Sequence, residues 1–161
     1  MFNHLLHHTI GALHLLSAVI ALLAGAAVLL RTKGTRFHVW TGRIYFGAML
    51  MTNANALAIY ELFGRFGPFH VLALLSLLSV LIGLVPVLRR KPGWLERHAS
   101  YVLGSWVDLC AAAVAEISSH LLRLPFGPTV IVSFAVVIIG GVTWMRVSLA
   151  KRFPSPAAAT T

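Results

Sequence analysis

Acidic residues are scarce in this sequence. Four Asp and Glu stand against thirteen Lys and Arg among 161 residues, and charged residues make up 11% of the chain. Hydrophobic residues make up 58%, and the mean hydropathy is +0.86. Because a soluble globular chain carries about 25% charged residues, this composition excludes an ordinary water-soluble domain. We expect the chain to lie in a lipid bilayer.

Cysteine is nearly absent, since Cys110 is the single one and lies inside an apolar run. An intrachain disulfide is therefore excluded, and a small buried apolar residue is the simplest interpretation. The first eight residues contain no Lys or Arg, and the run that follows lacks a convincing small-residue cleavage site. We therefore expect no signal peptide and a first segment that stays in the protein.

The basic residues give a formal net charge of +9, but they lie between or after the apolar runs. The connections Arg31–Arg43 and Arg89–His98 carry four each, whereas Glu61–Gly67 and Arg123–Pro128 carry one each. Such alternation is a topology signal, so we expect no nucleic-acid binding. It predicts basic connections and a C-terminus in the cytoplasm, with the N-terminus outside.

Five apolar segments are long enough to cross a bilayer, which takes about 20 residues each. We predict an all-α integral membrane protein, an up-down bundle of five transmembrane helices. Residues 1–153 would form a single domain, and the tail 154–161 would be disordered. The expected helices cover about 9–30, 40–62, 68–88, 98–122 and 129–149.

Polar residues recur on one side of the second and fourth expected helices. At 100° per residue the fourth helix aligns His98, Ser105 and Glu116, with Asp108 and His120 at the flanks. The second helix aligns His38, Gly42, Tyr45, Met49, Thr52, Asn53, Ala56 and Tyr60. We expect the two stripes to face each other, with Asn53, Asp108 and Tyr45 in a polar seam. Such a seam can simply fix helix register by hydrogen bonding.

The histidines fall into two tiers of depth. His38 and His98 lie at the expected cytoplasmic helix ends, and His14, His70 and His120 lie in the outer third of their helices. A single histidine near the interface is most simply a capping or interfacial residue, because the free-energy cost of a histidine in a membrane is lowest there. The tiered set is what favours a functional interpretation.

Two cofactor chemistries fit the tiers. Paired imidazoles on different helices could ligate haem b, with Gly42 leaving room for the macrocycle and Arg43 or other arginines neutralising its propionates. Alternatively, Glu116 and His120, with His14 or His70, could ligate zinc or copper. A protein without cofactor, either a structural or interaction subunit or a small-solute transporter, remains the alternative to both.

The segment Gly34-Thr-Arg-Phe-His38-Val-Trp-Thr-Gly42-Arg43-Ile-Tyr45, with Gly67-Pro-Phe-His70 and Glu96-Arg97-His98, resembles a known bacterial family. It is a family of predicted membrane proteins, domain of unknown function twenty-three-oh-six. The resemblance covers residues 10 to about 122 and carries over to His38, Gly42, Arg43, Tyr45, His70 and His98. It implies a bacterial inner membrane but no activity, and nothing for the fifth helix or the Glu116/His120 pair.

The tiers are also similar to those of transmembrane dihaem b cytochromes, which implies electron transfer across the membrane and a membrane redox partner. This is an analogy at the level of fold. His38 precedes the expected helix start at residue 40, so ligation by His38 requires a second helix that begins earlier, near Phe37. The apolar fifth helix could serve as a homodimer contact.

Overall fold

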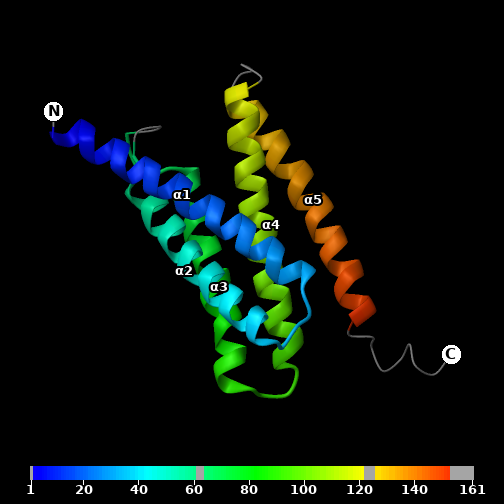
Figure 1. The fold of residues 1–161 in the computed structure, drawn as a ribbon. Coiled ribbons are helices and arrows are strands. Elements are labelled where there is room, and N and C mark those ends of the chain that lie inside the picture. The colour runs from blue at the N-terminus through cyan, green and yellow to red at the C-terminus, as the bar shows by residue number, and fades with distance from the viewer. Residues whose placement is uncertain (1, 61–63, 122–125, 153–161) are drawn as a thin grey trace. The chain divides into compact units, whose positions relative to one another are not determined.

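The computed structural model is all helical over the residues that it describes, which are 2–60, 64–121 and 126–152 (Figure 1). Side chains are described for the same residues except 2–8, 68, 119–121 and 126. The five helices are α1 Phe2–Leu30, α2 Arg36–Ala58, α3 Pro68–Arg89, α4 Trp94–Leu121 and α5 Phe126–Arg152. The predictions of an all-α chain and of five helices are confirmed, whereas the tail 154–161 lies outside the described residues.

The second helix differs most from its predicted bounds. It begins at Arg36 instead of residue 40, because Thr35 caps it: the Thr35 hydroxyl oxygen accepts a hydrogen bond of 3.2 Å from the His38 N–H. It ends at Ala58 instead of residue 62, since Ile59 is already extended. Helices α1, α4 and α5 begin earlier than predicted, and α3 and α5 extend further toward the C-terminus.

Four stretches among the described residues are long and apolar enough to cross a membrane, namely Thr9–Leu30, Phe69–Arg89, Trp94–Ser118 and Gly127–Arg152. Helix α2 does not reach that standard. Its polarity lies inward, since Thr41, Tyr45, Thr52 and Asn53 are buried. Several of its large apolar side chains lie outward, such as Trp40 and Ile44, which are 63% and 53% exposed, whereas Met49 is buried. This is the reverse of a helix on the surface of a soluble protein.

The chain divides into two compact units, Met1–Val80 and Leu81–Thr161, with the boundary inside α3. In the first unit, α1 and α2 pack as an antiparallel pair, side by side in Figure 1. Small residues of the pair, Ala21, Ala24 and Ala48, are buried, and so is Met49. Gly25 is buried too, and small residues of this kind let two helix backbones approach closely in a membrane.

In the second unit, α4 packs against α5 and against the end of α3. Gly141 of α5 faces Val107 so closely that a Cβ there would overlap the valine side chain. Gly83 of α3 would place a Cβ 3.2 Å from Tyr101 Cβ and 3.3 Å from Val102 Cγ2. Two glycines therefore let the backbones on either side approach α4.

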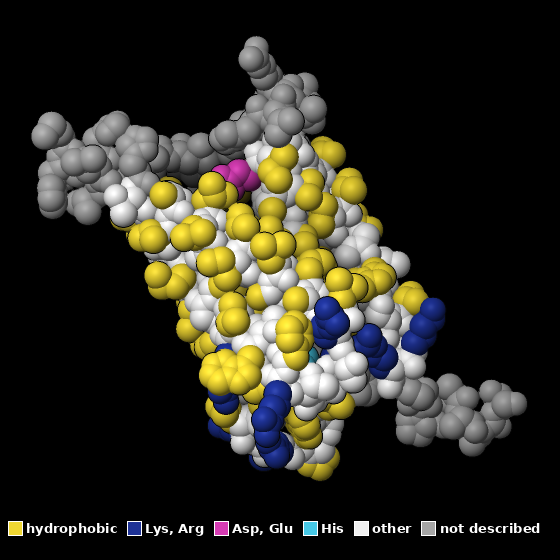
Figure 2. Space-filling model, viewed as in Figure 1, with side chains coloured by type: hydrophobic (Ala, Val, Ile, Leu, Met, Phe, Trp, Pro, Cys, Tyr) yellow, Lys and Arg dark blue, Asp and Glu magenta, His cyan; other side chains and the backbone are white. Residues whose placement is uncertain are grey.

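The exposed surface of both units is apolar. Hydrophobic side chains spread over the visible face in Figure 2. Leu23 of α1 and Ile131 of α5 are 67% and 70% exposed. Contiguous apolar surface of this kind is unsuited to water and suited to lipid.

Adjacent glycines in α5 test this packing. We expect Gly141→Ala to destabilise the protein by about 1–3 kcal/mol, because the added methyl group must displace Val107. Gly140→Ala is the matched control, since a Cβ at position 140 meets nothing within 4 Å. Alanine is also the better helix former by about 1 kcal/mol. Thermal unfolding in detergent measures both, and equal unfolding temperatures for the two variants would contradict the close α4–α5 contact.

Candidate functional site

A buried hydrogen-bonded cluster joins α1 to α2. The His14 Nδ1 lies 3.0 Å from the Thr52 carbonyl oxygen. The Thr52 hydroxyl lies 2.9 Å from Ser17 Oγ and 2.9 Å from the Ala48 carbonyl oxygen, so it shares one proton between them. Ser17 Oγ in turn donates to the His14 carbonyl oxygen at 2.9 Å. The cluster thereby fixes the register of the two helices.

The bond of His14 also fixes which ring nitrogen carries the proton. A carbonyl oxygen can only accept, so Nδ1 of His14 must be the donor. In a neutral ring the lone pair then resides on Nε2. This is the state in which metal-ligating histidines are commonly held, by donation from the other ring nitrogen to a backbone carbonyl.

His98 is held in the same way in the second unit. Its Nδ1 donates to the Gly83 carbonyl oxygen at 2.8 Å, from the start of α4 to the end of α3. Pro86 lies inside α3 and lacks an N–H, which removes the helical partner of the Ile82 carbonyl and not that of Gly83. The bond leaves Nε2 of His98 with its lone pair.

His70 is in the opposite state. Its Nδ1 accepts a hydrogen bond of 3.1 Å from the Gly67 N–H, so a neutral ring carries its proton on Nε2. The ring is 3% exposed and lies between Tyr60 and Phe66, at centroid distances of 4.5 and 4.9 Å. Within the described residues Nε2 has no hydrogen-bond partner. A protonated Nε2 opposes the predicted role of His70 as a ligand.

Helix α2 begins early enough to place His38 in its first turn, where the side chain is half-buried. Such an early start is what ligation by His38 requires. Gly42 follows one turn later, and a Cβ there would meet nothing within 4 Å. Arg43 is exposed, with its guanidinium carbon 5.1 Å from the Trp40 ring centroid. The space beside Gly42, where the sequence predicts the haem macrocycle, is therefore open.

The predicted metal ligands of α4 are described only in part. Glu116 is exposed on α4, and the side chain of His120 lies outside the described residues. No group of three His, Cys, Asp or Glu in the described part of the chain is placed to hold a metal ion. The zinc or copper set of Glu116, His120, His14 and His70 includes His120, so it stays a prediction.

The seam predicted between the second and fourth helices rests on buried residues. Asn53 is 4% exposed and donates from Nδ2 to the Met49 carbonyl oxygen of its own helix at 2.8 Å. Tyr45 is 3% exposed, and Asp108 is half-buried. That these residues face one another stays a prediction, whereas the contact of α2 with α1 through Thr52 and Ser17 was missed.

The three tautomers can be measured directly. In protein labelled with nitrogen-15 histidine, we expect proton-bearing Nδ1 atoms for His14 and His98 and a proton-bearing Nε2 atom for His70. Chemical shifts of the ring nitrogens in detergent distinguish the two forms, and single substitutions assign them. Finding the same tautomer for His70 and His98 would contradict these hydrogen bonds.

A family model matches residues 11–151, and its description is Predicted membrane protein (DUF2306). The motifs indicated a resemblance only as far as about residue 122, whereas the family model also covers nearly all of α5. No curated protein and no solved structure matches the chain. The sequence and the apolar helices thus agree with the family model, and the chain belongs to this family of predicted membrane proteins.

Proposed function

We propose that this protein binds haem b in the bacterial inner membrane, with Nε2 of His98 as an axial ligand, and takes part in electron transfer across that membrane. One observation carries the proposal: the His98 Nδ1–H donates to the Gly83 carbonyl oxygen at 2.8 Å. This bond orients the ring and leaves Nε2 as a ligand atom. The sequence predicts His38 as a further ligand.

The residues present fit a haem in further respects. His38 belongs to the helix, where its backbone is fixed by the Thr35 cap. The open space at Gly42 is one turn away, and the exposed Arg43 can neutralise a propionate. Bound haem b would supply one-electron transfer, and the protein would supply its ligands, its orientation and a dry surrounding.

In this proposal α2 crosses the bilayer as the fifth span. It has 23 residues, so at about 1.5 Å per residue it is long enough for a hydrocarbon core of about 30 Å. It packs along α1, which is apolar enough to span, and turns Trp40 and Ile44 outward. Its residues Thr41, Thr52 and Asn53 are buried, so they do not oppose insertion as exposed polar residues would.

The basic ends of the helices lie in the cytoplasm. In the second unit α4 begins and α5 ends at the same end, which carries Arg89, Arg90 and Lys91 together with Lys151 and Arg152. In the first unit the connection from α1 to α2 carries Arg31, Lys33 and Arg36. The excess of Lys and Arg on cytoplasmic connections orients such helices. The N-terminus of α1 then lies outside.

Cysteine labelling tests this topology. In a Cys110→Ala background, we expect a membrane-impermeant maleimide added to intact cells to label Arg65→Cys but not Pro92→Cys. Both positions are exposed in connections, so both should react after the cells are opened. Labelling of position 92 from outside would reverse the orientation.

Absorption spectra of the purified protein test the haem. We expect a Soret band, with sharp α and β bands after reduction, and loss of this low-spin spectrum in both His98→Ala and His38→Ala, because the iron loses an axial ligand. His70→Asn is the matched control, since it removes an imidazole that is in the wrong tautomer and keeps an acceptor for the Gly67 N–H. A spectrum that survives His98→Ala would rule out this ligand.

A structural or interaction subunit is the second candidate. It is favoured by the His14, Ser17 and Thr52 cluster, whose bonds explain these residues by helix packing alone. A colourless protein, metal-free by elemental analysis and unchanged after reconstitution with haem, would support this candidate or a small-solute transporter. A colourless protein with stoichiometric zinc or copper would instead restore the predicted metal site.

A further inference from the structure

Residues 31–43, which form the connection from α1 to α2 and the first two turns of α2, are basic and include no acidic residue. Lys33, the one lysine in this stretch, bonds to the end of α1. Its Nζ donates to the carbonyl oxygens of Val28 at 2.6 Å, Leu29 at 2.8 Å and Arg31 at 3.1 Å. These bonds spend its three N–H groups at the C-terminal end of α1, where a cation is favourable. The other basic residues of the connection are arginines in different surroundings.

Arg31, Arg36 and Arg43 have no carboxylate partner among the described residues. The Arg31 guanidinium lies 5.7 Å from the Phe37 ring centroid, and that of Arg43 lies 5.1 Å from the Trp40 centroid. An aromatic face attracts the cation without using its N–H groups as conventional donors. Each guanidinium thus retains donors for an anion.

Arg36 is the first residue of α2. A cation at a helix N-terminus is unfavourable by about 0.3–1 kcal/mol, because the peptide dipoles already place positive charge there. Helix stability therefore does not explain this arginine. An anion beside it would neutralise both the side chain and the helix end.

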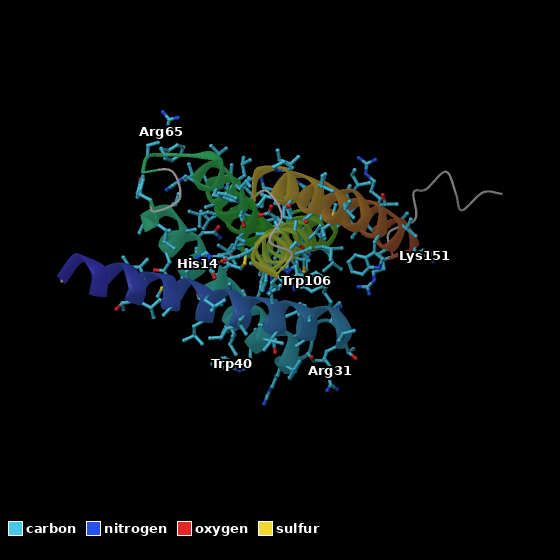
Figure 3. All side chains as sticks on the ribbon, turned by 90° about the horizontal axis from the view of Figure 1, so that it is seen from above. His14, Arg31, Trp40, Arg65, Trp106 and Lys151 are labelled. Carbon is cyan, nitrogen blue, oxygen red and sulfur yellow. The ribbon has the colours of Figure 1, made fainter. Side chains whose placement is uncertain are left out.

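A shallow hollow of about 380 Å³ lies at this position, lined by Gly34, Arg36, Val39, Trp40 and Arg43. Its four helical residues follow the spacing i, i+3, i+4 and i+7, so they share one face of α2. Trp40 is 63% exposed, and Figure 3 shows it projecting outward from the ribbon. The hollow thus combines two guanidinium groups with an indole suited to a membrane interface.

We propose that this hollow binds the phosphodiester headgroup of an anionic phospholipid between Arg36 and Arg43. The apolar surface next to it distinguishes a lipid from free phosphate. Val39 and Ile44 are 45% and 53% exposed on the same helix, and an acyl chain can cover them. The site goes beyond haem binding: it shares Arg43 with the proposed haem site, but lipid binding can be measured without haem.

Native mass spectrometry of the full-length protein in mild detergent tests the site with phosphatidylglycerol and phosphatidylcholine as probes. We expect phosphatidylglycerol to bind more tightly than phosphatidylcholine. Its affinity should fall on the order of 30-fold in Arg36→Gln/Arg43→Gln, because each substitution removes about one charge interaction at the membrane interface. Arg89→Gln/Arg90→Gln removes two charges from the other basic connection and is the matched control, expected to change affinity less than about twofold.

Folding is checked by thermal unfolding, and Arg36→Gln should not lower stability, since it removes a cation from a helix N-terminus. The single variants Arg36→Gln and Arg43→Gln separate the two contacts if the double variant unfolds. Equal losses in the two double variants would mean a general charge effect and would overturn the site. Equal affinity for both lipids would overturn it too, as would full displacement of phosphatidylglycerol by millimolar inorganic phosphate.

Discussion

Hydrogen bonding within a hydrocarbon layer is the constraint on which the rest of this structure depends. A polar group that meets no water must find its partner inside the protein, or it costs several kcal/mol. In the first unit Thr52 and Ser17 meet this demand by bonding to each other and to helix carbonyls. Helix α2 consequently turns its polar side inward and its apolar side outward. The modest hydropathy of α2 thus comes in part from polar residues that are buried.

The same demand sets the chemistry of the histidines. A backbone carbonyl facing Nδ1 leaves a lone pair on Nε2, as for His14 and His98, and a backbone N–H facing Nδ1 does the opposite, as for His70. Residues of one type, all inside apolar helices, therefore differ in what they can bind. His98 can act as a ligand, whereas His70 offers a buried donor.

Much of the fold could be predicted because each apolar run is bounded by charge, glycine or proline. The start of α2 was misplaced because Thr35 caps it within a basic connection, where the expected apolar core had not begun. The tautomer of His70 depends on the Gly67 N–H and on two neighbouring rings, which no spacing encodes. The partner of His98, the Gly83 carbonyl oxygen, likewise depends on the packing of α4 against α3.

The inverted polarity of α2 is tested most directly by spin labels one turn apart on this helix. In a Cys110→Ala background, a label at Ile44, 53% exposed, should be relaxed strongly by dissolved oxygen and weakly by a water-soluble nickel chelate, as in lipid. A label at Ala48, 9% exposed, should be relaxed weakly by both, as in a protein interior. Strong relaxation of the label at position 44 by the nickel chelate would place this face of α2 in water and contradict a membrane-spanning α2.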